Sequence, residues 1–315
     1  MTGATGAPVA ARLARRPPAP TLEWLREELE PRGRVTRVMA LHGGISHANH
    51  AITLAAADGA ELRVVLRRWV RPGWRESDPA FTPEQEVATY ALLAASDVPA
   101  PRVLAADASG VRADVPAIVL SMVPGRPPAL AGPAGGRERL VRELARPLPL
   151  LHAIDPAAAR TTLPPYEPFG RPAEMAPPAW ARSATAWERA VSIVRRDRPA
   201  PDGVFIHRDY HPGNTLWERG RLNAIVDWTS ASFGPLAVDL AHMRVNLAVE
   251  ADLALADAFL AAHDRVAGGT VADHDPAWDV LNVLDFVSDF PDAEGLGPKG
   301  ERLETFLTGA LARLG

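Results

Sequence analysis

The most informative stretch of the chain reads FIHRDYHPGNTLW at residues 205–217, and AIVDW follows it at residues 224–228. Short apolar runs alternate here with turn-forming residues, a pattern typical of strands joined by tight loops. Strands are expected at 204–207, 215–218 and 222–226, with a turn at Arg219 and Gly220. Asp209 and Asn214 then lie in a loop before a hairpin, and Asp227 lies in the loop after it.

These three polar side chains suit phosphoryl transfer. One carboxylate must accept the proton of an attacking hydroxyl, while an amide oxygen and a second carboxylate hold Mg²⁺ against the phosphates. The hairpin would bring Asp209, Asn214 and Asp227 to one end of a cleft. The alternative is an ordinary loop in which an aspartate caps a helix and the asparagine forms an Asx turn.

The first half of the chain has the pattern of a sheet with helices. A short helix is expected at 22–30 with Thr21 as its N-cap, after a Pro-rich tail at 1–20 that we expect to be disordered. Strands are expected at 34–41, 51–55, 61–69, 102–106 and 117–122. TPEQ at 82–85 fits a capping box, so a helix begins at Thr82 between the third and fourth strands.

The second half is mainly helical, and a Pro/Gly-rich stretch from Val123 to Gly136 separates it from the first. Helices are expected at 138–153, 183–196, 236–249, 251–266, 276–290 and 299–314, with a Pro-rich loop at 160–179. Pro147 and Pro149 should break or kink the first of these helices. The expected organisation is an N-lobe at 21–122 and a C-lobe at 123–315.

Composition excludes several classes of protein. The chain has 315 residues, of which 47% are hydrophobic and 23% charged, which is normal for a soluble globular protein. It has no cysteine, so disulfides, thiolate metal sites and a cysteine nucleophile are excluded. A net charge of −4 argues against nucleic acid as a partner. We expect neither a membrane span nor a secretory signal, and therefore a cytoplasmic protein.

HRDYHPGN and VDW resemble the catalytic loop and the metal-binding motif of the aminoglycoside phosphotransferase and choline kinase-like family, relatives of the protein kinases. The resemblance implies a two-lobed α+β protein-kinase-like fold, with a five-stranded antiparallel sheet plus a helix in the N-lobe and a mainly helical C-lobe. It also implies Asp209 as catalytic base and Asn214 and Asp227 as ligands of Mg²⁺. His207 and Asp239 would give structural support to the loops.

The N-terminal segment LHGGISHAN resembles the phosphate-covering loop of the same family. Gly43 and Gly44 let the backbone approach a phosphate closely, and Ser46 can donate a hydrogen bond to a phosphate oxygen. Many hairpins carry two glycines, so these letters alone are weak evidence. Within the resemblance they predict nucleotide binding at 43–46.

VVLR at residues 64–67 resembles the strand that carries the nucleotide-binding lysine in the family. In this chain the position of that lysine is occupied by Arg67. Arginine can fork between a carboxylate and a phosphate oxygen, and Glu86 matches the acidic partner in the family. Lys299 is the chain's only lysine. IVLSMVPG resembles the hinge between lobes, where the backbone at Ser121 and Val123 would pair with the purine of ATP or GTP.

The acceptor site is predicted from an acidic run. Seven carboxylates lie in one stretch without Arg or Lys, at Asp273, Asp275, Asp279, Asp285, Asp289, Asp292 and Glu294. Asp285 and Asp289 are four residues apart and so share a helix face. One interpretation is a pocket for a cationic small molecule that carries a hydroxyl, such as an aminoglycoside. The alternative is a solvated acidic face.

The sequence therefore favours a small-molecule kinase that transfers the γ-phosphate of ATP or GTP to a hydroxyl, with Mg²⁺ as cofactor and an antibiotic as acceptor. A metabolic kinase of an amino alcohol, sugar or amino acid is an alternative. A nucleotide-binding pseudoenzyme is another, because the usual lysine is replaced by Arg67.

Overall fold

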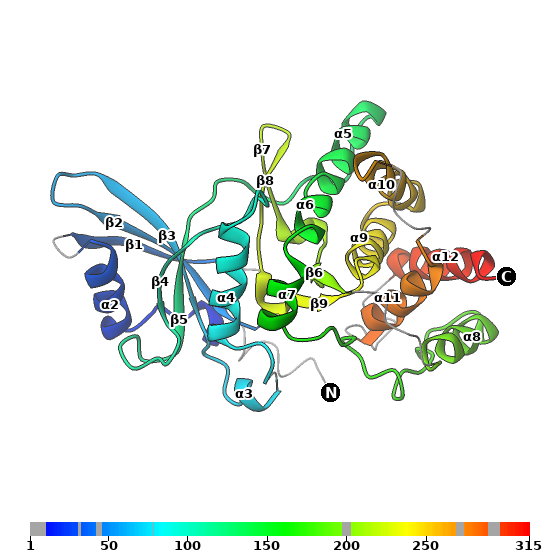
Figure 1. Ribbon diagram of the computed structural model, residues 1–315, viewed down its shortest axis with the longest axis horizontal. Helices are drawn as coiled ribbons and strands as arrows, with labels where there is room; N and C mark the ends of the chain where they lie inside the picture. The colour runs from blue at the N-terminus through cyan, green and yellow to red at the C-terminus, as the bar shows by residue number, and fades with distance from the viewer. Residues whose placement is uncertain are drawn as a thin grey trace. The chain divides into compact units, whose positions relative to one another are not determined.

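The computed structural model describes residues 11–30, 33–41, 46–77, 79–196, 203–268, 274–288 and 297–315 (Figure 1). The chain divides into two compact units. The first comprises Met1–Ala95 with Ala100–Pro124, and the second comprises Ser96–Pro99 with Gly125–Gly315. The main part of the second unit thus begins at Gly125, within the Pro/Gly-rich stretch.

The first unit contains the expected five-stranded antiparallel sheet. Its strands are β1 (Arg34–Leu41), β2 (Ala48–Ala55), β3 (Glu61–Arg68), β4 (Val103–Asp107) and β5 (Ala117–Ser121), in the order β1-β2-β3-β5-β4. Alternation along β3 buries Val64 and Leu66 in a cluster with Trp24 and Leu25 of α2 (Ala19–Leu29). Arg67, at the next position, points to the opposite face of the sheet, as the period of two predicts.

Two expectations at the N-terminus are wrong in detail. α2 begins at Ala19, inside the expected tail, and residues 11–14 of the same stretch form a helical turn. Thr21 lies within the helix and is not its cap; it is buried and its hydroxyl donates to the Ala113 carbonyl at 2.6 Å. A long-range hydrogen bond has replaced the local one that the cap would have made.

The helix that follows β3 begins as expected. α4 (Pro83–Ala94) has Thr82 as its N-cap, and the Thr82 hydroxyl accepts from the Gln85 backbone N–H at 3.2 Å. The cap fixes the first turn, and Glu86 follows in it. A short helix, α3 (Trp74–Ser77), precedes it and was not expected.

The second unit is mainly helical, as predicted. Its helices are α5 (Ala134–Ala145), α6 (Leu148–His152), α7 (Pro156–Thr162), α8 (Ala184–Val194), α9 (Ala237–Glu250), α10 (Leu253–Val266), α11 (Pro276–Ser288) and α12 (Pro298–Arg313). Pro147 separates α5 from α6, as its missing N–H predicts. α9 is nearly all buried because it packs against α10, α11 and α12 (Figure 1).

Two small sheets complete this unit. β6 (Val204–Ile206) pairs with β9 (Ser232–Gly234), and β7 (Thr215–Glu218) pairs with β8 (Arg221–Ile225), all antiparallel. β9 was not expected. At the surface, the Lys299 ammonium of α12 lies 2.6 Å from the Glu250 carboxylate of α9. Among the described residues, no helix combines the length and apolar character needed to cross a bilayer.

Candidate active site

The loop after β6 is held by one buried carboxylate. Asp239, in the first turn of α9, is fully buried and accepts the backbone N–H groups of His207 at 3.0 Å and Arg208 at 2.8 Å. His152 contacts the same carboxylate at 3.1 Å. Arg208 adopts a φ of +69°, which a non-glycine residue reaches only when its surroundings enforce it. The Asp239 carboxylate therefore links α9 to the backbone of this loop.

Asp209 is the centre of the loop's side-chain contacts. The Asn214 amide nitrogen donates to the Asp209 carbonyl at 3.0 Å and to its Oδ2 at 2.9 Å. On the other oxygen, Oδ1, His242 Nε2 lies at 3.0 Å. Burial opposes ionisation of Asp209, but the hydrogen bond and charge of His242 hold its pKa well below the usual range. Asp209 is thus a carboxylate at neutral pH, and a third of its side chain is exposed.

Asp227 is brought beside this loop by the β7–β8 hairpin. The Val226 backbone N–H donates to the Asn214 carbonyl at 2.9 Å, and the His207 ring lies 3.1 Å from the Val226 carbonyl. Asp227 then turns with a φ of +65°, and the Thr229 hydroxyl donates to its Oδ1 at 3.2 Å. These contacts bring together the four residues that the motif predicted.

The donor set of Asn214 and Asp227 fits Mg²⁺. The amide nitrogen of Asn214 donates to Asp209, so its amide oxygen is the atom that can contact a cation. Within the described ranges, no cluster of three or more His, Cys, Asp or Glu side chains could hold a metal ion. Mg²⁺ does not need one, because it is usually bound by one or two protein oxygens together with waters and substrate phosphates.

His211 shapes the tip of the loop. Its Nδ1 accepts from the Gly213 backbone N–H at 3.2 Å, so the neutral ring carries its hydrogen on Nε2. Burial lowers the pKa of His211 to about 4, which keeps the ring neutral at pH 7. A Cβ at position 213 would lie 2.5 Å from the His211 ring, so the tight turn requires glycine.

In the first unit, Arg67 lies where the motif predicted it, and it is paired. Its NH1 donates to Glu86 at 2.7 Å, and its Nε donates to the Asn49 side chain at 3.1 Å. Both members of the ion pair are buried, at 6% and 1% exposed. A buried pair of this kind is costly to break, because the remaining charge loses its partner. Asn49 was not predicted, although its position opposite Arg67 in the β2–β3 register places it there.

For the other predicted nucleotide-binding residues the structure gives mainly their place in the fold and their burial. Gly43 and Gly44 lie outside the described residues, and Ser46 is half-buried just before β2. Ser121 ends β5, where its hydroxyl accepts from the Arg102 backbone N–H at 2.9 Å. Val123 follows and is half-buried.

The acidic run does not form a solvated face in its described part. Asp279 is fully buried and bound by Arg244 at 3.1 Å, His274 at 2.9 Å and Arg313 at 2.9 Å. Asp275 accepts from the Ala277 backbone N–H. The basic partners come from other helices, so the lack of Arg and Lys within the run did not leave Asp279 unpaired. Asp273, Asp289, Asp292 and Glu294 lie outside the described residues.

Asp285, predicted to bind the acceptor, is buried instead of open to solvent. It is 5% exposed, and its Oδ1 accepts from the Gly170 backbone N–H at 3.0 Å. Burial raises the pKa of Asp285 to about 6, since hydrogen bonds from the backbone of Gly170 and Phe169 only partly offset the desolvation. Asp285 therefore anchors the loop at 169–170. Beside this anchor, the Arg208 guanidinium stacks 4.0 Å over the Phe169 ring.

His242 is the main residue that the sequence analysis missed. It follows Asp239 by three positions on α9, so the two share a helix face. Because Asp239 faces the loop, the spacing could have identified His242 as a second residue that contacts it.

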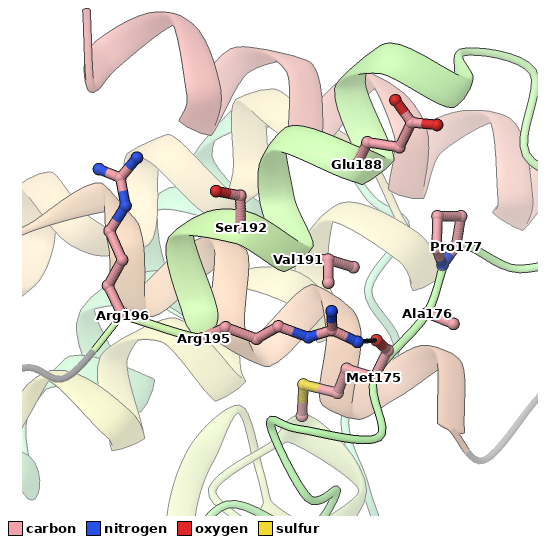
Figure 2. A pocket seen from close by; sticks show the side chains of 8 residues that line it. All are labelled: Met175, Ala176, Pro177, Glu188, Val191, Ser192, Arg195 and Arg196. Atoms are coloured by element: carbon pink, nitrogen blue, oxygen red, sulfur yellow. Dashed lines mark hydrogen bonds between the residues drawn. The ribbon is translucent and has the colours of Figure 1, made fainter.

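A separate hollow of about 450 Å³ lies between α8 and the loop at 175–177 (Figure 2). Arg195 spans it and donates to the backbone carbonyls of Met175 at 2.9 Å and Ala173 at 3.2 Å. The guanidinium thus fastens this loop to α8, and none of the predicted site residues lines the hollow.

Solved structures similar to this chain include phosphotransferases of antibiotics. An aminoglycoside-3′-phosphotransferase of type VIII has a TM-score of 0.54 at 23% identity, over 84% of this chain and 98% of that one. A macrolide 2′-phosphotransferase from Brachybacterium faecium has 0.53 at 22%, over 84% and 91%. A thermostable mutant of an aminoglycoside phosphotransferase, in complex with ADP and hygromycin B, has 0.58 at 15%, over 90% and 97%. At these identities the likeness shows a shared kinase-like fold.

Curated protein sequences include no match to this chain. The family itself is shown by a family model that covers most of the length, matching residues 37–275. The matched range includes the loop with Asp209 and the pair of Arg67 with Glu86. The chain therefore belongs to the phosphotransferase enzyme family, whose members are enzymes that transfer phosphate to a hydroxyl acceptor.

Proposed function

We propose that this enzyme transfers the γ-phosphate of ATP or GTP to a hydroxyl of a small molecule in a Mg²⁺-dependent reaction. The observation that carries the proposal is the arrangement of Asp209, Asn214 and Asp227, which hydrogen bonds of the loop and the hairpin hold side by side. The set combines a base with two oxygen donors, as phosphoryl transfer requires.

Each of these residues has a distinct role in the proposal. Asp209, ionised at neutral pH, accepts the proton of the attacking hydroxyl. Asn214 orients Asp209 through its amide nitrogen and offers its amide oxygen to the metal, together with the Asp227 carboxylate. When bound, Mg²⁺ neutralises charge on the transferring phosphates. Catalysis then depends mainly on positioning and on charge stabilisation.

For the nucleotide, the proposal assigns phosphate binding to Arg67. Glu86 and Asn49 hold its guanidinium in place, and an arginine keeps its charge at any working pH. A relative that binds ADP supports a nucleotide co-substrate. Gly43, Gly44 and Ser46 would cover the phosphates, and the backbone at Ser121 and Val123 would contact the purine.

For the acceptor, the proposal is a hydroxyl compound that carries an amine, of the aminoglycoside type. The support is a relative of the same fold, an aminoglycoside phosphotransferase whose structure holds hygromycin B. Asp285 is already engaged by Gly170, so a direct contact to the amine is proposed through Asp289 more than through Asp285.

The test is a panel of acceptors with Mg²⁺ and either ATP or GTP. It should comprise aminoglycosides, macrolides, amino alcohols and sugars, with the phosphorylated product detected by mass spectrometry. Transfer to an aminoglycoside that ceases in Asp209→Asn supports the proposal. Transfer only to an amino alcohol or a sugar identifies a metabolic kinase, and no transfer to any member contradicts the proposal.

A second experiment tests the metal site. Asp227→Ala should abolish the strengthening of nucleotide binding by Mg²⁺, because it removes the carboxylate that holds the ion against the phosphates. Titrations with ATP, with and without Mg²⁺, measure this directly. The matched control is Asp257→Ala, which removes an exposed carboxylate that contacts Arg244 and should leave the Mg²⁺ effect unchanged. An undiminished Mg²⁺ effect in Asp227→Ala would place the metal elsewhere.

A further inference from the structure

His242 contacts the proposed base but has no role in the chemistry described so far. Its Nε2 lies 3.0 Å from Oδ1 of Asp209, and 14% of its side chain is exposed. The contact comes from α9, the helix that also supplies Asp239. The protonation of the His242 ring decides what this contact does to the carboxylate.

The second ring nitrogen identifies that protonation. His242 Nδ1 lies 3.2 Å from the side chain of Asn282 on α11. Asn282 donates from Nδ2 to the Trp278 carbonyl at 3.1 Å. A carbonyl oxygen only accepts hydrogen bonds, so the amide nitrogen of Asn282 must face Trp278 and its amide oxygen must face His242. His242 Nδ1 therefore carries a hydrogen and donates it to Asn282.

This leaves a clear choice at the other end of the ring. A neutral imidazole has only one hydrogen, so its Nε2 would present a lone pair to Oδ1 of Asp209, and two acceptors would face each other. The contact is attractive only with a proton between them. An imidazolium supplies it, and the low pKa of Asp209 and the raised pKa of His242 both agree with that assignment.

The groups around the ring favour the charged form. Burial disfavours it, but Asp209 from the loop and Asp285 from α11 are both acidic and face the ring. His211 packs at a ring distance of 5.9 Å and is neutral at pH 7, so it adds no opposing charge. The uncharged ring of Phe169 lies 6.3 Å from the His242 ring, measured between the ring centres.

We propose that His242 is a positioning residue for phosphoryl transfer: locked as a donor by Asn282, it holds Oδ1 of Asp209 while Asn214 holds Oδ2. The two donors on opposite oxygens fix the plane of the carboxylate and hence the direction in which it accepts the proton. This inference rests on the proposed role of Asp209 as base. It extends that role to a chain of three side chains that links α11, α9 and the loop.

The proposal has a definite pH signature. As pH rises through the pKa of His242, the proton lost is the one on Nε2, because Nδ1 stays bound to Asn282. The lone pair then repels Oδ1, the carboxylate turns, and kcat falls. Since the pKa of His242 is raised from 6.5, we expect this decline at a higher pH than an ordinary histidine would give. His242→Gln keeps a non-titrating amide near the position of Nε2 and should lose the decline.

The kinetic test uses Mg²⁺-ATP with water as acceptor, which requires no identified substrate. His242→Ala should lower kcat by roughly 10- to 100-fold, as misplaced catalytic groups do, without changing the KM for ATP. His242→Gln should recover most of the rate. His263→Ala is the control, since it removes another buried ring, on α10, whose Nδ1 makes no hydrogen bond. A normal kcat in His242→Ala, or a wild-type pH profile in His242→Gln, overturns the proposal.

A second readout is independent of turnover and separates this inference from the proposed function. Nitrogen-15 NMR of the His242 ring in the whole protein should show that both nitrogens stay protonated to a pH above the ordinary 6.5. In Asp209→Asn the ring should titrate at lower pH, because its carboxylate partner is gone. If the ring loses one hydrogen at or below pH 6.5, or if its titration is the same in Asp209→Asn, the proposal fails even for an active kinase. If both shifts are as expected but no substrate is phosphorylated, the proposed function fails alone.

Discussion

Two regions of the second unit in which carboxylates were predicted to be functional differ in what their carboxylates contact. In the loop at 207–214, the polar residues singled out by the motif meet through contacts of about 3 Å, and Asp209 stays ionised and partly exposed. In α11, Asp279 and Asp285 are buried on a helix whose acidic letters had indicated an open, cation-binding face. The carboxylate of the loop is partly exposed at the candidate site, whereas those of α11 are buried and bound by other groups of the protein.

The difference lies in how far the fold covers the carboxylates. Asp209 is held by Asn214 within the loop and by His242 of α9, and a third of its side chain remains exposed. Asp279 is bound by Arg244, Arg313 and His274 and has no exposed side-chain surface. A run of like charges therefore indicates an open charged face only where the fold leaves its members partly exposed. The variants below test this distinction.

The largest effect should come from the loop. Asp209→Asn keeps the shape of the side chain but removes the proton acceptor, and loss of a general base costs roughly 10² to 10⁴ in rate. We expect kcat to fall by that range while ATP binding stays near the wild-type value. Steady-state kinetics, with calorimetric titration of ATP, measures both. Undiminished turnover would remove Asp209 from the mechanism.

The next effect should come from α11 and concern stability. Asp279→Ala leaves the buried Arg244 without its main partner, and breaking such a pair costs about 3–5 kcal/mol. Urea unfolding should show this loss. Asp257→Ala is the matched control, because it removes a mostly exposed partner of the same arginine, and surface pairs contribute about 0–1 kcal/mol. Equal losses in the two variants would mean that the burial of Asp279 has little energetic weight.

The smallest effect should come from Asp285 and depend on pH. Its pKa is raised to about 6, so the folded protein binds this proton more tightly than the unfolded chain does. The resulting stability is fully present below about pH 4 and is lost as pH rises through 6. Asp285→Asn removes the titration and keeps an oxygen for Gly170. We therefore expect the free energy of unfolding of the variant, measured relative to that of the wild type, to rise by about 1–3 kcal/mol between pH 4 and pH 7.

Unfolding curves at several pH values check this. If the stability difference between Asp285→Asn and the wild type is the same at pH 4 and pH 7, Asp285 is not a buried titrating group. It would then regain its place as a candidate for direct acceptor binding.

The sequence predicted the strands of the large sheet, the start of α4 and the loop that contains Asp209 and Asn214. These features have local signals, namely the alternation in β3, the cap at Thr82 and the spacing of the two loop residues. Contacts between distant helices were not predictable in this way. Nothing near Asp285 indicates that the Gly170 backbone would bind it. β9 has only three residues and α7 only seven, which is too short for a periodic signal. His242 is an intermediate case, since only the helix period relates it to Asp239.

The single lysine has a practical consequence for labelling. Lys299 is 43% exposed at the start of α12, and the chain contains no thiol. Apart from an α-amine, an amine-reactive dye or surface can therefore attach to one side chain, on the helix that packs against α9 and α11. Its ion pair with Glu250 is of the exposed kind, so its loss on modification should cost little. A cysteine introduced at any other exposed position would then accept a second, chemically independent probe.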